Sequence, residues 1–358
     1  MAFDLQKLLR PHIASLKPYS SARDEYSGKE GIFLDANENA LGSVSAQPFN
    51  RYPDPYQSAL KIKLATIKQV PSANIFLGNG SDEAIDLLFR AFCNPGKDNV
   101  IIMPPTYGMY EVSAGINDVA IKKVSLTPSY DMDVKGVLAA VDDQTKIIFI
   151  CSPNNPSGNI INRQAIYQVL AAFHGLVVID EAYIDFNDEP GFSSEIKQFP
   201  NLLVMQTLSK AWGLASLRLG MAYASEEIIG ILNKIKPPYN ISGLTQNTVL
   251  KAFDNTALLE SMVQEILTEK ENLKQELNQI KAVEMVYPSS ANFLLVKVPM
   301  ANKVYQELIH KKIIVRDRSK VHHCDDCLRI TVGSKEENKQ LVIALKEVLT
   351  KQISHQQN

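Results

Sequence analysis

Alternating helical and apolar segments between about residues 57 and 250 most constrain the fold of this 358-residue chain. Four of these segments, NVIIMP, KIIFICSP, LVVIDEAY and NLLVMQTLSK, are almost continuously apolar. Such runs are typical of strands buried on both faces in a parallel sheet that helices cover. The segment SDEAIDLLFRAFC instead places Ile85, Leu88, Phe89 and Phe92 on one helical face, with Ser81 as its expected N-cap. The pattern predicts an α/β fold, with a mostly parallel sheet flanked by helices.

The pattern changes after about residue 255, where LLESMVQEILTEKENLKQELNQIK predicts one long amphipathic helix. NFLLVKV, IIVRD and LRITVG predict strands, and helices are expected at 302–311 and 335–350. We therefore expect a smaller α+β domain over residues 256–358 and a large domain over 48–255. Residues 1–47 are expected to form an N-terminal arm and part of the small domain.

Charge and composition argue against several classes of partner and location. The formal net charge is -2, which gives no reason to expect nucleic acid as a partner. No run of about 18 apolar residues is present, so no membrane partner is expected. The N-terminal residues lack the basic start and apolar core of a signal peptide. The four cysteines are too few for a disulfide scaffold, and we expect a cytoplasmic protein.

Polar residues follow the apolar runs where α/β sheets bind ligands, beyond the carboxyl ends of the strands. SPNNPSG follows IIFIC, Asp180 follows LVVI, TLSK follows LLVMQ, and LGNG precedes the helix that starts at Ser81. GNGS could be a simple turn or an anion cradle formed by free N–H groups at the helix start. It is neither a P-loop nor a dinucleotide fingerprint. Each segment alone is a weak signal, but their convergence predicts a binding site.

Lys210, Asp180 and Arg218 suggest the chemistry of this site. Lys210 could be an ordinary solvated lysine, but a lysine desolvated near another cation can attack a carbonyl to form a Schiff base. Arg218 would be that cation and could bind a phosphate through its planar fork. Asp180 could cap a helix or occupy a turn, or it could pair with a ring nitrogen. An aldehyde, a ring nitrogen and a phosphate together indicate pyridoxal phosphate.

The chain resembles the fold type I pyridoxal-phosphate aminotransferases and, within them, the histidinol-phosphate aminotransferases. The resemblance runs in order through LKPYSSAR, DANENA, RYPDPY, GNGSDE, PPTYGMY, SPNNPSG, DEAYIDF, TLSKAWGLASLRLG, ANFLLVK, IIVRD and CLRITVG. SPNNPSG and SKAWGLASLRLG are typical of the superfamily, whereas Tyr19 with NEN, RYPD, PTYGMY and the late VRD and LRITVG are specific to the narrower group. Ala40, Trp212, Ser216 and Ser157 depart from the usual pattern, and none of these changes removes a reactive group.

The resemblance implies a role for each residue of the cofactor site. Lys210 would bind the cofactor covalently and move a proton between Cα and C4′, with Asp180 on the pyridinium nitrogen. Asn155 and Tyr183 would hydrogen-bond the phenolic oxygen, and Tyr107 would stack on the ring. The phosphate would be held by Ser81, Asp82, Thr207, Ser209 and Arg218.

The resemblance also implies the substrates and a second subunit. Tyr52 would reach the cofactor phosphate of the neighbouring subunit in a homodimer, and Tyr19 and Asn37 would close over the substrate. Arg329 would grip the carboxylate of amino and keto acids, with Arg316 as a second cation. The implied reaction is transamination of L-histidinol phosphate with 2-oxoglutarate by ping-pong kinetics, giving imidazole acetol phosphate and glutamate in histidine biosynthesis.

Other readings remain open. A general or aromatic amino-acid aminotransferase would need Arg329 alone, and a threonine-phosphate decarboxylase would need no keto acid. A cofactor-binding transcription regulator would need a DNA-binding module, for which the roughly fifty residues before the cofactor domain leave little room. HHCDDC, at 322–327, could bind zinc, but no second C-x-x-C or spaced histidine pair accompanies it. We therefore expect no metal, and Cys327 is expected to be a small buried residue.

Overall fold

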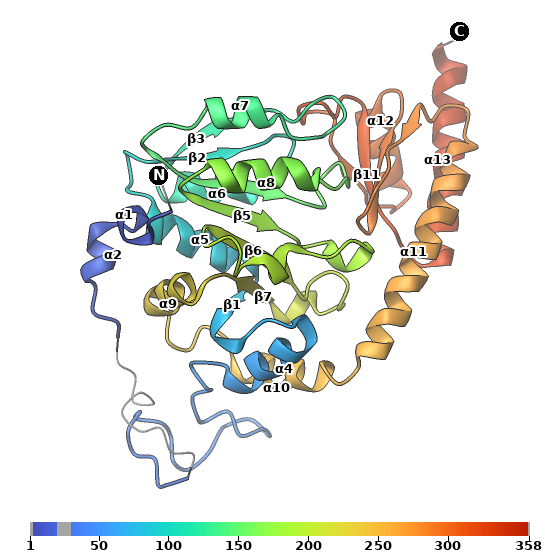
Figure 1. Ribbon diagram of the computed structural model, residues 1–358. Coiled ribbons are helices and arrows are strands. Elements are labelled where there is room, and N and C mark those ends of the chain that lie inside the picture. The colour runs from blue at the N-terminus through green and yellow to red at the C-terminus, as the bar shows by residue number, and fades with distance from the viewer. Residues whose placement is uncertain (1–2, 20–29, 357–358) are drawn as a thin grey trace.

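A computed structural model of the protein describes residues 3–19 and 30–356, and Figure 1 shows their arrangement. The large sheet consists of β1 (Ile75–Asn79), β2 (Asn99–Ile102), β3 (Ala120–Lys123), β4 (Thr145–Cys151), β5 (Leu176–Asp180), β6 (Leu202–Thr207) and β7 (Leu219–Tyr223). Their order across the sheet is β1-β7-β6-β5-β4-β2-β3. Only β7 runs antiparallel to its neighbours β1 and β6, so the mostly parallel sheet predicted from the sequence is confirmed.

Helices cover both faces of the large sheet (Figure 1). They are α4 (Ser58–Lys68), α5 (Ser81–Phe92), α6 (Met109–Ile116), α7 (Val134–Ala139), α8 (Arg163–Ala172), α9 (Glu226–Ile235) and α10 (Gly243–Ala252). Side chains of α5, α6 and α9 join one buried cluster, and those of α4, α7, α8 and α10 join another. The sheet lies between these two clusters, as expected for strands whose side chains are apolar on both faces.

Successive residues of an apolar strand contribute alternately to the two buried clusters. In β4, Ile147 and Phe149 pack on the side of α5, whereas Ile148 and Ile150 pack on the opposite side. Successive strand residues point to opposite faces, so a continuous apolar run is what a sheet covered on both sides requires. The four residues predicted for the buried face of α5 are all fully buried: Ile85, Leu88, Phe89 and Phe92.

The predicted N-cap of α5 is wrong. Gly80 occupies the N-cap position with φ +77°, and Ser81 is the first helical residue. The cap makes no side-chain hydrogen bond. Glycine fits here because few other residues adopt a positive φ at low energy. The first turn of α5 therefore keeps its N–H groups available to a ligand.

The C-terminal part of the chain builds the second sheet, with the order β10-β11-β9-β8. Its elements are α11 (Thr256–Asn278), β8 (Met285–Val286), β9 (Phe293–Lys297), α12 (Ala301–His310), β10 (Arg316–Asp317), β11 (Cys327–Thr331) and α13 (Lys335–Gln356). The strands are antiparallel, and helix side chains pack with them in a separate cluster. This agrees with the expected α+β unit, although β8 was not predicted and IIVRD contributes only two strand residues. The limits given for the domains stay predictions.

The remaining elements are short. They are α1 (Leu5–Leu8), α2 (Pro11–Ser15), and the 3-10 turns η1 (Ser72–Asn74), η2 (Ile184–Phe186), η3 (Phe192–Glu195) and η4 (Ala215–Leu217). Residues 30–50 form an extended arm that leaves the body of the molecule (Figure 1). Within the described residues, every helix is too short or too polar to cross a membrane.

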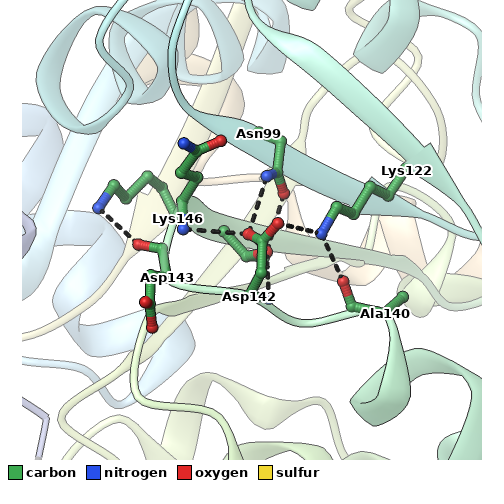
Figure 2. Close-up of polar contacts among 8 residues, drawn as sticks. Asn99, Lys122, Ala140, Asp142, Asp143 and Lys146 are labelled. Carbon is green, nitrogen blue, oxygen red and sulfur yellow. Dashed lines mark hydrogen bonds and ion pairs between the residues drawn. The ribbon is translucent and has the colours of Figure 1, made fainter.

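Figure 2 shows a polar network near the start of β4, at the edge of the sheet opposite the carboxyl strand ends. Asp142 accepts hydrogen bonds from Asn99 (3.0 Å) and from the Lys122 ammonium (2.6 Å), and Lys122 also donates to the Ala140 carbonyl (2.8 Å). These contacts, led by that of Lys122, hold the pKa of Asp142 well below its usual range. The network ties β2, β3 and the turn before β4 together, so we assign it to the scaffold.

Candidate active site

An open cavity of about 500 Å³ lies at the carboxyl ends of β4, β5 and β6, beside the start of α5. This is the edge at which open α/β sheets bind their ligands. Every residue predicted to bind the cofactor lines the cavity, with Tyr52 as the exception. The lining residues are Gly80, Ser81, Asp82, Tyr107, Cys151, Asn155, Asp180, Ala182, Tyr183, Thr207, Ser209, Lys210 and Arg218.

One end of the cavity is an anion cradle. Gly80 turns the chain into α5, and its N–H donates to the carbonyl of Arg218 (2.8 Å). The N–H groups of Ser81 and Asp82 at the helix start, with the positive end of the helix dipole, favour an anion. The Arg218 guanidinium lies 3.5 Å from the Asp82 carboxylate and is about half exposed, so it can turn to a ligand. A phosphate fits this end of the cavity.

Gly220 allows the cradle to approach β7 closely. A Cβ atom at this position would collide with backbone atoms of Gly80 and Ser81. We expect Gly220→Ala to displace the cradle, to destabilise the protein by about 1–3 kcal/mol and to weaken cofactor binding at least tenfold. Equilibrium titration of the apoprotein with cofactor, together with urea unfolding, measures both effects. Gly230→Ala in α9, where a Cβ meets no atom within 4 Å, is the matched control. Unchanged cofactor affinity in Gly220→Ala would contradict this account.

The middle of the cavity holds a buried carboxylate. Asp180 is 2 % exposed and accepts hydrogen bonds from the Tyr110 hydroxyl (2.7 Å) and the Ala182 N–H (3.1 Å). Desolvation raises the pKa of Asp180 to about 6, although these two donors oppose the shift. A buried carboxylate of this kind is stabilised when a positively charged N–H group binds next to it.

Tyr110 was missed in the sequence. It lies on α6, is fully buried, and stacks on Phe149 with ring centroids 4.7 Å apart. Nothing in the PPTYGMY motif indicates that the Tyr110 hydroxyl contacts Asp180, which lies seventy positions later at the end of β5. Its hydrogen bond fixes one oxygen of Asp180, which makes Tyr110 a positioning residue.

Lys210 lines the same cavity as Asp180. Its amine makes no hydrogen bond or ion pair within the described residues and lies 5.5 Å from the centroid of the Tyr183 ring. Although the side chain is exposed to the open cavity, desolvation of the amine lowers its pKa, and the charges of Arg329 and Arg218 lower it further. A lysine that is partly desolvated beside other cations is a ready nucleophile and base.

Asn155 and Arg329 connect the cavity to the small sheet. The Asn155 amide lies 3.5 Å from the Tyr183 hydroxyl, and its Oδ1 accepts a hydrogen bond from Arg329 of β11. Arg329 also lies over the Phe293 ring, 5.3 Å from its centroid. Tyr107 donates to Asp82 (3.1 Å) and forms part of the cavity wall. Amide, phenol and guanidinium groups from both sheets therefore meet at the cavity.

Five predicted site residues are not part of the cavity lining: Arg329, which contacts the lining residue Asn155, and Tyr19, Asn37, Arg316 and Tyr52. Tyr19 and Asn37 are exposed, and Arg316 is exposed on β10. Tyr52 is 51 % exposed and stacks on Tyr239, with ring centroids 4.4 Å apart. Within the described residues, none of Tyr19, Asn37 and Tyr52 lines the cavity that holds Lys210.

The HHCDDC segment forms the turn that leads into β11, whose first residue is Cys327. Cys324 and Cys327 are buried free thiols, and the carbonyl of His323 accepts a hydrogen bond from Tyr130 (2.6 Å). Within residues 3–19 and 30–356, no three His, Cys, Asp or Glu side chains are grouped so that they could hold a metal ion. The segment links the small sheet to the loop that carries Tyr130.

Comparison with known proteins reveals close relatives. The profile of the family "Aminotransferase class I and II" matches residues 24–345. A histidinol-phosphate aminotransferase from Cytophaga hutchinsonii is 56% identical over 97% of this chain and 99% of its own length. The crystal structure of the Clostridium acetobutylicum histidinol-phosphate aminotransferase has a TM-score of 0.78 and 25% identity, covering 85% of this chain and 92% of that one. The Sinorhizobium meliloti histidinol-phosphate aminotransferase, solved with pyridoxal-5'-phosphate, has a TM-score of 0.77 and 23% identity, covering 95% and 97% of the two chains.

Proposed function

Because this chain belongs to the class I and II aminotransferase family, we propose that it transfers the amino group of L-histidinol phosphate to 2-oxoglutarate. The products are imidazole acetol phosphate and glutamate, and the reaction belongs to histidine biosynthesis. One observation carries the substrate assignment: a histidinol-phosphate aminotransferase is 56% identical to this chain over nearly the full length of both proteins. The free thiols of all four cysteines are consistent with a cytoplasmic location.

The cavity fits pyridoxal phosphate as the cofactor. The cradle at Gly80 and Ser81, with Arg218, suits its phosphate, and the buried Asp180 carboxylate suits a protonated ring nitrogen. The Lys210 amine, which makes no hydrogen bond within the described residues, suits its aldehyde carbon. The Asp82 N–H and the hydroxyls of Thr207 and Ser209 also line the cavity, and we assign them to the phosphate as further ligands. The Asp82 carboxylate is anionic and would repel a phosphate.

Bound pyridoxal phosphate supplies a carbonyl carbon for amino-group exchange and a ring that accepts the electron pair released at the substrate Cα. Lys210 would then remove the Cα proton and deliver it to the cofactor carbon C4′, because desolvation and the nearby arginine charges lower the pKa of its amine below the ordinary lysine value. Asp180 would keep a proton on the ring nitrogen. Asn155 and Tyr183 would hydrogen-bond the phenolic oxygen, and Tyr107 would pack on the ring. Asp180, Lys210 and Tyr183 are therefore the catalytic residues that we propose.

Arginine side chains of the small sheet recognise the anionic ends of the substrates. Arg329 lies beside Asn155 at the cavity, and Arg316 is its direct partner across β10 and β11. Two guanidinium groups can bind the phosphate of histidinol phosphate and, in the second half of the reaction, a carboxylate of 2-oxoglutarate.

We also propose a homodimer in which Tyr52 reaches the cofactor phosphate of the partner subunit. The arm exposes large apolar side chains, including Ile32 (91 %), Leu34 (83 %) and Leu41 (98 %), which a second subunit would bury. Tyr19 and Asn37 would close over the substrate in the same assembly. Mixing inactive Lys210→Ala with Tyr52→Ala subunits tests this, since a mixed dimer would contain one complete site. Recovered activity is expected, and no recovery would place Tyr52 outside the neighbouring site.

The function is tested by a half-reaction. Holoenzyme is mixed with L-histidinol phosphate in the absence of a keto acid, and the absorption of the bound cofactor is followed. We expect conversion from the aldehyde to the amine form, which 2-oxoglutarate then reverses. Conversion with phenylalanine or tyrosine but not with histidinol phosphate would leave an aminotransferase with a different substrate. Release of carbon dioxide from threonine phosphate would instead indicate the decarboxylase.

A further inference from the structure

Three arginines lie on one face of the β10–β11 hairpin. Arg316 is directly opposite Arg329 in the antiparallel register, so both side chains leave the same face. Two residues further on, the Arg318 N–H donates to the Cys327 carbonyl (2.8 Å) and continues this register. Alternation along a strand therefore places Arg318 on the face of Arg316 and Arg329. Consistent with this placement, Arg316 lowers the pKa of Arg318, and Arg318 lowers that of Arg329, each after a larger effect of desolvation.

This cluster, Arg316, Arg318 and Arg329, lacks an anionic partner within the described part of the chain. The side chains of Arg316 and Arg318 make no hydrogen bond or ion pair there, and Arg329 contacts the neutral amide of Asn155. The other described arginines each contact a carboxylate or a carbonyl oxygen. Their partners are the Arg90 carbonyl for Arg10, Glu38 for Arg51, Asp86 for Arg90, Glu195 for Arg163 and Asp82 for Arg218.

Neighbouring groups do not neutralise the cluster. Asp317 lies between two of the arginines in sequence, but its carboxylate accepts hydrogen bonds from Ser319 (2.8 and 2.6 Å) and Asn302 (2.9 Å). Burial raises the pKa of the Cys324 thiol to about 11 and that of Cys327 to about 12, so both stay neutral at pH 7. Like charges held together in this way are unfavourable unless an anion binds them.

We propose that Arg318 is a third phosphate-binding residue, which makes the site selective for a phosphomonoester over a carboxylate at the distal end of the substrate. The inference rests on the proposed function and deepens it. A carboxylate carries one charge and is satisfied by the fork of one arginine. A phosphomonoester carries a charge of about −1.5 to −2 near pH 7 and has three acceptor oxygens, so it can use further guanidinium groups.

The position of the cluster connects it to the reaction cavity. Arg329 donates to Asn155, which lines the cavity. The charges of Arg329 and Arg318 both act on the Tyr183 phenol, which forms part of the cavity wall. An amino substrate bound at Lys210 therefore directs its far end toward these arginines.

The test compares two half-reactions of the holoenzyme of Arg318→Gln. With L-histidinol phosphate, we expect kcat/KM to fall about ten- to hundredfold, mainly through KM, because a charge-assisted hydrogen bond to the phosphate is lost. With L-glutamate, we expect a change of less than about threefold. Inorganic phosphate should inhibit the glutamate half-reaction of the native enzyme more strongly than that of Arg318→Gln. Arg318→Lys should give an intermediate result, because it keeps the charge and loses the fork.

Lys320→Gln is the matched control, because it removes one positive charge from an exposed position two residues away. It should leave both half-reactions and the phosphate inhibition unchanged. Equal losses with both substrates in Arg318→Gln would assign Arg318 a structural role and overturn the proposal. If the native enzyme does not react with histidinol phosphate, the proposed function fails separately, and the phosphate inhibition alone decides the role of Arg318. Equal inhibition of native enzyme and variant would then overturn it.

Discussion

Replacing Lys210 by alanine is expected to lower the rate of transamination about 10⁴-fold or more, while the cofactor still binds. Among the described residues that line the cavity, Arg218 is the one other basic side chain, and arginine does not supply a free amine. The loss of Lys210 removes both the nucleophile and the base that moves the Cα proton. Stopped-flow absorption in the half-reaction with L-histidinol phosphate measures the effect.

Two controls separate the chemical role of Lys210 from its charge. Lys210→Arg keeps a cation near Asp180 and is expected to be nearly as slow as Lys210→Ala, because arginine does not supply a free amine. A small added primary amine should partly restore Lys210→Ala, since it can act as a base in the space left by the side chain. Nearly native rates in Lys210→Arg, or a Lys210→Ala variant that still turns over rapidly, would exclude Lys210 as the base.

The positions that could be predicted from the sequence share one physical basis. Asp180, Thr207 and Asn155 each follow an apolar run, and parallel strands buried on both faces bring their carboxyl ends to one edge. Neither long-range packing nor side-chain detail is needed for that inference. The same logic placed Lys210, three residues after β6, at the cavity that the structure contains.

Other features depend on contacts that local patterns do not encode. Ser81 resembles an N-cap, but the approach of β7 to the turn places Gly80 there and makes Ser81 the first helical residue. The hydrogen bond of Tyr110 to Asp180 depends on how α6 packs against the sheet. Arg318 lies just outside the two-residue strand β10. Its position on the same face as Arg329 follows from the register of the β10–β11 hairpin and not from the spacing of the two residues in the sequence. Tyr52 lies just after the arm of residues 30–50, and the site that we expect it to complete belongs to another chain.

Asp180→Asn is expected to separate activity from stability. The amide has no negative charge with which to hold a proton on the ring nitrogen, so we expect the rate to fall about 10³-fold. The fold should survive, because an asparagine oxygen can accept one of the two hydrogen bonds, and the Tyr110 hydroxyl can rotate to accept the amide N–H. The half-reaction with L-histidinol phosphate measures the first effect.

The same change should stabilise the cofactor-free protein at alkaline pH. Folding raises the pKa of Asp180 from 3.8 to about 6, so its stabilising contribution is complete below about pH 4 and is lost as the pH rises through 6. Above that pH the buried carboxylate costs about 3 kcal/mol of unfolding free energy, which asparagine avoids. Because the hydrogen bonds to the charged carboxylate are replaced by weaker neutral ones, we expect apo Asp180→Asn to be about 1–2 kcal/mol more stable than the native apoprotein at pH 8.

Glu181→Gln provides the matched control for this prediction. Glu181 is the next residue, is equally buried, and desolvation raises its pKa to about 7, but it does not line the cavity. Its carboxylate accepts hydrogen bonds from the Phe192 N–H and from Gln206 (2.8 Å). The Oε1 of Gln206 has no hydrogen-bond partner among the described residues and could accept from a glutamine at 181. We therefore expect Glu181→Gln to stabilise the apoprotein at pH 8 while transamination stays near the native rate. Urea unfolding at pH 4.5 and 8 decides the matter: a stability difference between Asp180→Asn and native apoprotein that does not grow with pH would contradict the buried-carboxylate account.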